Sequence, residues 1–448
     1  MDKKQFMEDL AQKAFAAAQV DSELYTRYDV KRGLRDINGK GVLAGLTQIG
    51  DVLSHTETPE GTMDGPGSLL YRGIEINELV NGFLKEGRNG FEETAYLLLF
   101  GKLPNAQTLA DFQKLLYSYR TLPQDFIHDS MLKLPSRDIM NGMAQSILSL
   151  YTLDKNPEDT GIPNVVDQSL KLIALFPIIA AYCYRAYAYR FMGKSLILHP
   201  PSKTLSTAAN FLRMLRKDKS WTPLEERILD LTLVLHAEHG GGNNSSFTTH
   251  VVSSSLTDTY SAITAAISSL KGPRHGGANI RVIQMFEDIK KHVKNWTSDT
   301  EIEAYIDKII SKEAFDRSGL VYGIGHAVYS VSDPRAIIMS YHVEELAKEK
   351  GMEEELDLYR RVERIAPIVI GQRRKIYKGV SANVDFYSGL LYRMLNIPQE
   401  LFTPIFAISR IVGWSAHRIE ELANNGKIIR PAYKGVSSKT NYIPMEQR

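Results

Sequence analysis

Three observations predict a mainly α-helical fold with a few short strands near the N-terminus. From Phe91 onward, apolar residues recur at helical spacing through most of the chain, as at Phe91, Ala95 and Leu98. Short β-branched pieces interrupted by glycines are confined to the stretch from Val30 to Val52. Apolar residues make up 43% of the 448 residues and charged residues 24%, which is enough for a sizeable core and for two domains.

The elements follow in order from periodicity and from helix-breaking residues. Residues 1–24 predict a first, exposed helix, and Asp64-Gly65-Pro66-Gly67 predicts a loop. The helix from Phe91 ends at Gly101 and Pro104, and a proline pair at 200–201 marks a later break. Further helices are expected within 105–152 and at 162–192, 224–235, 253–270, 279–294, 299–313, 336–350, 352–370, 386–396 and 402–422, with an irregular tail from 424.

Charge and cysteine content exclude several classes of protein. The 54 lysines and arginines nearly balance 52 acidic residues, so bulk charge favours neither nucleic acid nor an anionic membrane surface. Cys183 is the only cysteine, which excludes an internal disulfide and a cysteine-based zinc site. Together with an N-terminus that lacks the pattern of a signal or presequence, this predicts a reduced, cytoplasmic setting.

The most lipid-like stretch runs from Leu172 to Tyr184. It contains Pro177 and is shorter than the ~20 apolar residues that span a bilayer, so we expect a kinked core helix and no membrane partner.

A histidine bracketed by glycines and a proline is the first candidate functional residue. His275 lies in Gly272-Pro273-Arg274-His275-Gly276-Gly277, directly before the periodic run that starts near Ile280. We therefore expect it in a turn at a helix N-terminus, where the positive end of the helix dipole disfavours a charged ring. A neutral imidazole can still donate one N–H to a developing oxyanion.

Three other histidines also lie beside glycines. His236 and His239 are three residues apart at a predicted helix end, and with His250 they offer a metal site as one reading, although a structural role is favoured for His236. His326, in Tyr322-Gly323-Ile324-Gly325-His326, is either a ligand-facing residue or an ordinary loop histidine.

Isolated arginines and one aspartate complete the set. Arg410 interrupts an apolar helical stripe, so its guanidinium needs an anionic partner, which is either a ligand carboxylate or an internal acidic side chain. Arg335 follows Asp333-Pro334, and Arg430 precedes a proline in the tail. Asp385 comes before a helical run and is either its N-cap or a general base.

Taken together, these residues resemble the citrate synthase family from about Gly61 to Lys434. The motifs that carry the resemblance stand in matching order: Tyr71-Arg72-Gly73, Phe91-Glu92-Glu93-Thr94-Ala95-Tyr96, His236-Ala237-Glu238-His239, Gly272-Pro273-Arg274-His275-Gly276-Gly277-Ala278-Asn279, Gly325-His326-Ala327-Val328-Tyr329, Asp333-Pro334-Arg335, Asn383-Val384-Asp385 and Gly413-Trp414. The individual pieces are short, and the ordered set is what is specific.

The resemblance implies condensation of acetyl-CoA with oxaloacetate and hydrolysis of citryl-CoA, without a metal or other cofactor. It implies that Asp385 removes the methyl proton, His275 hydrogen-bonds the enolate oxygen and His326 polarises the oxaloacetate carbonyl. The substrate carboxylates would be bound by four residues, namely His239, Arg335, Arg410 and Arg430. Arg430 is expected to reach the site of the other subunit in a homodimer.

The family fold implies a large helical domain (1–274 and 388–448) and a smaller domain (275–387) that closes over the substrates. Ser330 stands where many relatives have a basic residue, so the CoA phosphates are assigned instead to Lys378, with Arg374 and Lys375. A solvated charge run is the alternative for these three residues.

The alternatives differ in substrate or in class. A 2-methylcitrate synthase would use propionyl-CoA, and one methylene changes binding by only about 1–3 kcal/mol, so the motifs do not discriminate the two. A histidine-based metallohydrolase would lose activity with chelators, and a non-catalytic scaffold would tolerate Asp385→Asn.

Overall fold

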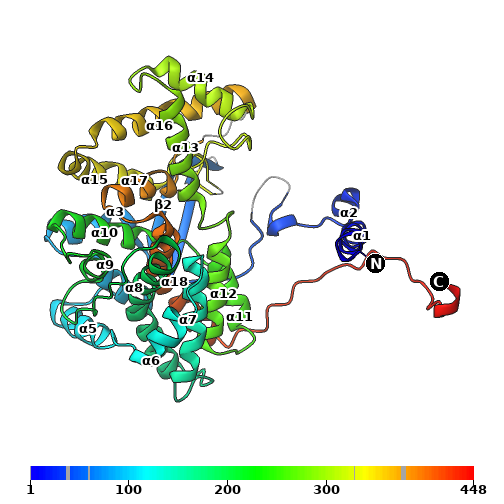
Figure 1. The fold of residues 1–448 in the computed structure, drawn as a ribbon, viewed down its shortest axis with the longest axis horizontal. Coiled ribbons are helices and arrows are strands. Elements are labelled where there is room, and N and C mark those ends of the chain that lie inside the picture. The colour runs from blue at the N-terminus through cyan, green and yellow to red at the C-terminus, as the bar shows by residue number, and fades with distance from the viewer. Residues whose placement is uncertain (1, 37–40, 59–60, 327, 375–379) are drawn as a thin grey trace. The chain divides into compact units, whose positions relative to one another are not determined.

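The computed structural model describes residues 2–36, 41–58, 61–326, 328–374 and 380–448. Helices dominate it, and the strands of its described part form one small sheet (Figure 1). The prediction of a mainly α-helical fold with few short strands is confirmed.

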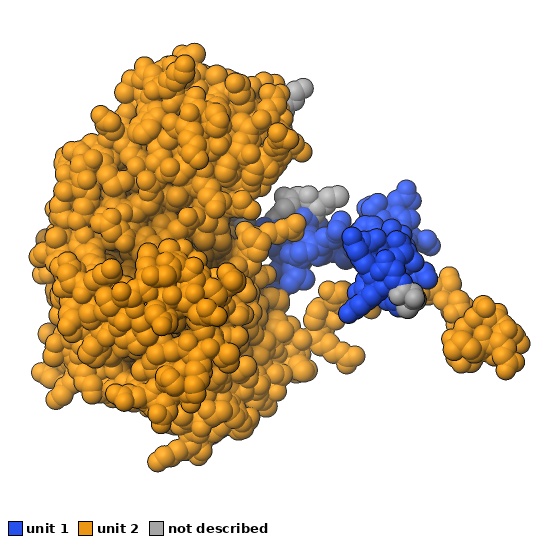
Figure 2. Space-filling model, in the orientation of Figure 1, with its two compact units in different colours: residues 1–46 blue, residues 47–448 orange. Residues whose placement is uncertain are grey.

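The chain divides into two compact units, residues 1–46 and residues 47–448, coloured separately in Figure 2. Unit 1 holds α1 (Lys3–Ala17), α2 (Ser22–Arg27) and a 3₁₀ turn (Arg32–Leu34), none of which has a buried residue. The single helix predicted over residues 1–24 is therefore two, and Asp21 begins the second by accepting the N–H of Glu23. The predicted large domain included residues 1–46, which here form a unit of their own.

Unit 2 begins with an antiparallel sheet of order β1-β2-β3. β1 (Gly50–Thr58) pairs with β2 (Gly61–Tyr71), which turns into β3 (Ile74–Glu75). The prediction of a loop at residues 64–67 was wrong, because this stretch belongs to β2. The register shifts between Leu53 and His55, so residues 65–67 of β2 have no Cα partner in the ladder, and a proline is tolerated there. Strand β1 starts at Gly50, near the end of the 30–52 region that was predicted to hold short strands or turns.

Most predicted helix ranges have a counterpart in unit 2, but the helices at 76–85, 207–215 and 244–253 were not predicted. The helices of unit 2 are α3 (Ile76–Lys85), α4 (Phe91–Phe100), α5 (Ala106–Ser118), α6 (Gln124–Phe126), α7 (Ile139–Ser149), α8 (Ile162–Met192), α9 (Thr207–Leu215), α10 (Pro223–His236), α11 (Asn244–Ser253), α12 (Thr259–Lys271), α13 (Ala278–His292), α14 (Asp299–Ile310), α15 (Pro334–Lys350), α16 (Glu353–Arg374), α17 (Val384–Met394) and α18 (Phe402–Ala423). A π-helical turn (Ile127–Leu132) follows α6, and short 3₁₀ turns lie at Leu150–Leu153, Gln399–Leu401 and Met445–Gln447.

One predicted helix boundary was wrong. Residues 253–270 were expected as one helix, but Ser253 ends α11 and a new helix starts at Thr259. Asp258 makes this break, because its side chain accepts the Ser261 N–H at 2.8 Å and caps α12.

Two long helices form the centre of unit 2. α8 is long and apolar enough to span a membrane, but 83% of its apolar window is buried inside the protein, as expected for a core helix. α18 is buried from Phe402 to Arg418 and packs on α4, α8, α10, α11, α12 and α13. α18 therefore contacts α10 and α11, which flank His239 in the chain, and α12 and α13, which flank His275.

Other helices of unit 2 lie in two groups. In Figure 1, α13, α14 and α16 lie at one end of this unit and α5, α6 and α7 at the other. α15 packs on α16 and α17 but also on α3, α10 and β2. The contacts of α15 with α3, α10 and β2 cross the proposed boundary of the small domain at 275–387. They do not separate it from the rest of unit 2, so this domain stays a prediction.

Candidate active site

The loop between α10 and α11, residues 237–243, carries His239. α10 ends at His236, so His239 lies beyond the helix rather than on its face. Gly240 has φ +79°, which allows the chain to reverse there. The His239 ring is 5.2 Å from the His326 ring between centroids, and its Nε2 is buried without a hydrogen-bond partner in the described protein. Burial has the largest effect on the His239 pKa and the charge of Arg335 the next largest. Both hold it well below its ordinary value, so the ring is neutral.

His275 lies in the predicted turn directly before α13. Gly276 is required beside it, because a Cβ there would lie 2.5 Å from the carbonyl oxygen of Leu270. Burial, followed by the charge of Arg410, lowers the His275 pKa to about 4. The expected neutral ring is thus obtained, but chiefly through desolvation rather than through the helix dipole.

A serine and a tryptophan orient the His275 ring. Trp414 Nε1–H donates to Ser245 Oγ at 3.1 Å, and Ser245 Oγ is 3.0 Å from His275 Nε2. The Ser245 hydroxyl also donates to Asn243 Oδ1 at 3.1 Å, and because it has one proton, its contact with His275 does not by itself place the His275 ring proton. The sequence reasoning did not assign Ser245, and a polar residue two positions after Asn243 carries little signal of its own.

His326 has a defined tautomer. Its Nδ1 accepts the backbone N–H groups of Val328 (3.0 Å) and Tyr329 (3.1 Å), so the proton of the neutral ring is on Nε2. Gly323 and Gly325 precede it with φ of +81° and +99°, as expected for a glycine-dependent loop.

Asp385 lies beside the His326 loop. Gly325 N–H donates to the carbonyl oxygen of Ser381 at 2.7 Å, Asn383 N–H donates to that of Gly323 at 2.9 Å, and the Asn383 side chain donates to that of Gly325 at 2.8 Å. These bonds tie the two segments together. The N-cap of α17 is Asn383, whose side chain accepts the Asp385 N–H at 3.0 Å, so the capping role weighed for Asp385 was wrong.

The carboxyl group of Asp385 is therefore available for chemistry. Its Oδ1 is buried without a hydrogen-bond partner among the described residues. Burial raises the Asp385 pKa to about 7, while the charges of Arg335 and Arg410 oppose the shift. A carboxyl group that titrates near neutrality is suited to general-base catalysis.

Arg335 has an internal partner. Its Nε and one terminal nitrogen donate to Asp333 at 3.0 and 2.8 Å, a bidentate pair that is almost completely buried. Asp333 Oδ2 also accepts the Val384 N–H at 3.1 Å, so this pair helps to position the start of α17. Arg335 is thus held in a fixed orientation beside Asp385.

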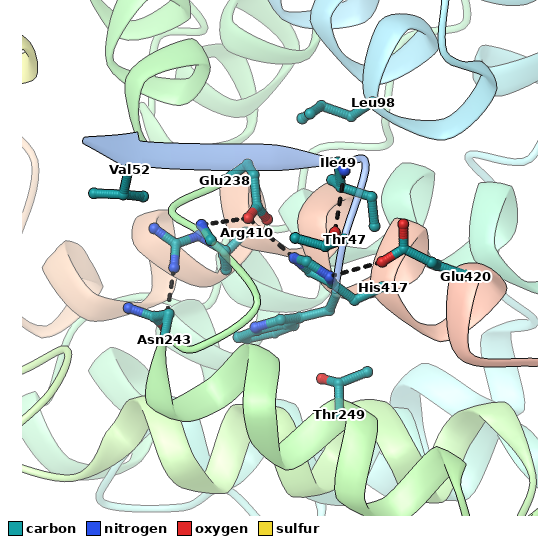
Figure 3. A network of polar contacts seen from close by, with 12 residues as sticks. Thr47, Ile49, Val52, Leu98, Glu238, Asn243, Thr249, Arg410, His417 and Glu420 are labelled. Atoms are coloured by element: carbon teal, nitrogen blue, oxygen red, sulfur yellow. Dashed lines mark hydrogen bonds and ion pairs between the residues drawn. The ribbon is translucent and has the colours of Figure 1, made fainter. Parts of the chain in front are cut away.

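Arg410 lies fully buried on α18. Its Nε donates to the carbonyl oxygen of His236 at 2.7 Å and one terminal nitrogen donates to Asn243 Oδ1 at 3.2 Å (Figure 3). Its other terminal nitrogen is buried without a partner, and in the described part of the chain no carboxylate forms an ion pair with it. Burial lowers the Arg410 pKa to about 10. The site therefore favours a ligand carboxylate, rather than an internal acidic side chain, as the anionic partner of Arg410.

One predicted site residue lies outside this cluster, and the described structure does not test three others. Arg430 is exposed on the tail after α18 and has no side-chain partner among the described residues. Lys375 and Lys378 lie outside the described residues, and Arg374 ends α16, with nothing described of its side chain. The CoA-phosphate assignment and the role of Arg430 stay predictions.

The residues that are spaced for a metal ion differ from the predicted set of His236, His239 and His250. Among the described residues, the group spaced for a metal ion is His250, His417 and Glu420, whose ligand atoms lie within 4.8 Å of one another. His236 is not part of it, because its Nδ1–H donates to the Thr232 carbonyl oxygen at 2.9 Å. Sequence reasoning missed His417, although its seven-residue spacing from Arg410 places both on one face of α18.

The cluster combines a base that titrates near neutrality with neutral histidines and arginines. A family model described as "Citrate synthase, C-terminal domain" matches residues 37–432. A citrate synthase from a Synechocystis species is 34% identical over 91% of this chain and 93% of its own length. A 2-methylcitrate synthase from Shewanella oneidensis is 34% identical over 88% and 95%.

A solved structure shares the fold. It is the ternary complex of carboxymethyl coenzyme A and oxaloacetate with citrate synthase from Thermoplasma acidophilum, with a TM-score of 0.76, 25% identity, and 94% of this chain and 99% of that chain covered. From its matched motifs, its family model and its fold, this chain belongs to the citrate synthase family.

Proposed function

We propose that this protein is a citrate synthase, which joins the acetyl group of acetyl-CoA to oxaloacetate and then hydrolyses the citryl thioester. The observation that carries the proposal is the Asp385 carboxyl group, which has a buried, unpartnered oxygen and a pKa raised to about 7. A thioester methyl group is a weak acid, so its deprotonation needs both a base in water-poor surroundings and a donor for the enolate oxygen.

The residues divide the reaction between them. Asp385 takes a methyl proton, and the electron pair of the broken C–H bond forms the enolate, whose oxygen accepts a hydrogen bond from the His275 N–H. The enolate carbon then forms a bond to the carbonyl carbon of oxaloacetate, and that carbonyl oxygen takes the proton of His326 Nε2. This assignment is supported by the His326 tautomer, because its Nδ1 is occupied by two backbone N–H groups.

The arginines supply the positive charge for a dicarboxylate substrate. The partnerless nitrogen of Arg410 favours a hydrogen bond to a substrate carboxylate, and the fixed Arg335 contributes to the same positive field. Water then adds to the citryl thioester, the C–S bond breaks and the CoA thiol leaves as citrate forms. No step of this route is assigned to a metal or other cofactor, and Arg430 completes the site from the second subunit of a homodimer.

A second candidate function is 2-methylcitrate synthesis from propionyl-CoA. The observation that favours it is the 34% identity to the Shewanella oneidensis 2-methylcitrate synthase, equal to the identity with the Synechocystis citrate synthase. The mechanism would be the same, because the extra methyl group changes only the acyl pocket.

The test is the release of CoA thiol by purified protein given oxaloacetate, with kcat/KM compared for acetyl-CoA and propionyl-CoA. We expect rapid release with a preference for acetyl-CoA. A higher kcat/KM for propionyl-CoA would make the protein a 2-methylcitrate synthase, and no release with either thioester would refute both functions.

A further inference from the structure

Three side chains that can bind a metal ion meet between two helices outside the catalytic cluster. His417 and Glu420 lie three residues apart on α18, so they share one face of that helix, and His250 comes from α11, which packs against α18. The ligand atoms of the three side chains lie within 4.8 Å of one another. None of these residues has a role in the proposed reaction.

The distances within this group suit a metal ion. His250 Nε2 is 3.1 Å from His417 Nδ1, and His417 Nδ1 is 3.9 Å from Glu420 Oε2. Ligand atoms that share a zinc ion at about 2.1 Å stand about 3–4 Å apart, so both separations already match. Two imidazoles and one carboxylate are also a ligand set that zinc uses in proteins.

A carboxylate holds the other nitrogen of each histidine. His250 Nδ1 is 2.8 Å from Glu421 Oε2, and His417 Nε2 is 3.0 Å from Glu238 Oε1. A carboxylate only accepts hydrogen bonds, so the proton of each neutral ring lies on the nitrogen that faces the carboxylate. Such carboxylate–histidine pairs orient metal-binding histidines and leave the opposite nitrogen to bind the ion.

This placement of the protons turns two lone pairs toward each other. With protons on His250 Nδ1 and His417 Nε2, the facing nitrogens carry none, and two lone pairs repel at the 3.1 Å that separates them. A positive charge between the nitrogens removes the repulsion. A proton would also do so, but a single proton makes one N–H···N bond and gives Glu420 no partner.

Glu420 provides the observation that favours a metal ion over a proton. Its Oε2 is buried without a hydrogen-bond partner among the described residues, whereas its Oε1 accepts the Gln48 N–H at 2.8 Å. A buried carboxylate oxygen without a partner is costly in free energy. Figure 3 shows Glu420 beside the His417 ring, on the side away from Glu238. An ion bound by both rings therefore gives this oxygen a partner as well.

The charges around the group also favour a cation. The carboxylates of Glu238, Glu420 and Glu421 surround the two rings, and no lysine or arginine in the described part of the chain forms an ion pair with any of them. Arg72 interacts electrostatically with Glu238 and Glu420 without such a pair. A divalent ion offsets two of these three negative charges where they are closest together.

The group also has space for a fourth ligand and access from solvent. A Cβ on Gly241 would lie 3.4 Å from His250 Nε2 and 3.8 Å from His417 Nδ1, so glycine leaves space beside both nitrogens. His417 is completely buried, whereas the side chains of His250 and Glu420 are each 13% exposed, so ions and water reach the edge of the group. A water molecule as fourth ligand completes a tetrahedral zinc site.

We propose that His250, His417 and Glu420 form a binding site for a divalent transition-metal ion, with zinc as the best match. Calcium and magnesium are disfavoured because they prefer oxygen ligands. The ion links α11 to α18 and, through His417, helps to hold Glu238 in the loop that carries His239. The proposal does not depend on the proposed function, because no step of that reaction uses these ligands.

The test uses untagged full-length protein, dialysed against EDTA and then into metal-free buffer, with Zn²⁺ as the probe. Calorimetric titration at neutral pH should show one ion bound per chain, with a Kd below about 1 μM. Co²⁺ added in place of Zn²⁺ should give the strong visible absorption of a four-coordinate ion, which differs from that of Co²⁺ in water.

Four variants identify the ligands. His250→Ala and Glu420→Gln each remove one ligand and should each weaken Zn²⁺ binding by at least about 100-fold, because an alanine has no donor atom and an amide is a weaker ligand than a carboxylate. Glu421→Gln keeps all three ligands and changes only the partner of His250, so binding should weaken by about 10–100-fold. His128→Ala removes an exposed histidine beside a carboxylate and is the matched control, with an unchanged Kd.

Thermal unfolding separates the loss of a ligand from the loss of the fold. Zn²⁺ should raise the Tm of wild type and of His128→Ala, because an ion that binds only the folded state stabilises it. It should leave the Tm of His250→Ala and Glu420→Gln unchanged, and circular dichroism checks that both are folded. If either is not, Glu421→Gln gives the comparison with every ligand intact.

Three results would overturn the proposal: a wild-type Kd above about 1 μM, a Kd that is the same in wild type, His250→Ala and Glu420→Gln, or a Co²⁺ spectrum identical to that of the ion in water. The second result would mean an adventitious ion only, bound by surface groups. These measurements involve no turnover. Absence of thiol release would therefore reject the proposed function and leave the metal site standing.

Discussion

The chemistry of individual residues is decided by burial more than by residue type. Asp385 and Asp333 are both aspartates near Arg335, but Asp333 forms a bidentate pair with it and its pKa is lowered. Asp385 has an unpartnered buried oxygen and its pKa is raised to about 7. The sequence predicted Asp385 as a base through its motif, whereas this difference depends on atoms brought together by folding.

Replacing Asp385 by asparagine should abolish catalysis while preserving the fold. We expect kcat to fall by at least about 10³-fold, because the base is lost and no other carboxylate in the described cluster replaces it. In wild type, kcat/KM should fall about tenfold per pH unit below pH 7, the range in which Asp385 becomes protonated. Thiol-release assays across pH, with circular dichroism as the folding control, measure both effects. A wild-type profile that is flat between pH 5 and pH 8, or substantial activity in the variant, would remove Asp385 from the role of base.

The same residue should make stability depend on pH. The folded-state pKa of Asp385 is raised from 3.8 to about 7, so the stabilising effect of its neutral form is complete below pH 3.8 and is lost as pH rises through 7. Asp385→Asn should therefore be more stable than wild type at pH 8.5, by at most about 4 kcal/mol, and similar to it near pH 4. Urea unfolding at the two pH values measures this difference, and a stability gap that is larger at pH 4 would contradict the assigned shift.

At the scale of elements, the glycines of the His326 loop bring two segments together. Gly323 has φ +81°, and a Cβ there would lie 2.9 Å from side-chain carbons of both Phe386 and Val282. The loop can therefore pack on α13 and α17 only with glycine at this position. The sequence predicted a glycine-dependent loop, but its contact with α17 was not readable from spacing.

Gly323→Ala should destabilise the protein by about 1–3 kcal/mol and lower kcat, because both the backbone conformation and the packing oppose a methyl group. Gly371→Ala is the matched control: it lies in α16 without a positive φ, and a Cβ added there would have no atom within 4 Å. The control should be neutral or stabilising by about 1 kcal/mol, since alanine favours a helix. Thermal unfolding and thiol release of both variants measure these effects, and equal behaviour of the two would contradict the steric argument.

At the scale of the whole molecule, the cluster holds the predicted catalytic and substrate-binding residues except Arg430, and the basic residues Arg374, Lys375 and Lys378 are not tested by the described structure. Arg430 is exposed on the tail that follows α18, which agrees with a role that requires a second copy of the chain. The homodimer, like the cytoplasmic location, is a prediction that the fold of one chain does not test.

Mixing two inactive variants tests the shared site. Arg430→Ala and Asp385→Asn should each be inactive, but unfolding and refolding them together should restore roughly a quarter of wild-type activity, because half of the dimers would be mixed and each would contain one intact site. A mixture of Asp385→Asn with His275→Ala is the control, since both residues belong to one subunit's site. Its mixed dimers keep one defect in every site and should stay inactive. Absence of recovery in the first mixture would place Arg430 in its own subunit's site or outside the site.

The sequence by itself determined the fold class and most helix positions, and it predicted which residues form the site. Amphipathic periodicity is a local property, so α8 and α18 were predicted to within a residue or two. Glycine-rich turns likewise indicated His275 and His326, because backbone strain depends on residue type.

Only the tertiary structure decided how those residues are charged and held. The bidentate Asp333–Arg335 pair, the Asn383 cap that releases Asp385, the Ser245–His275 contact and the Glu238–His417–His250 chain all join segments distant in sequence or depend on side-chain direction. Desolvation and hydrogen bonding act over a few ångströms in space, and no spacing along the chain measures that distance.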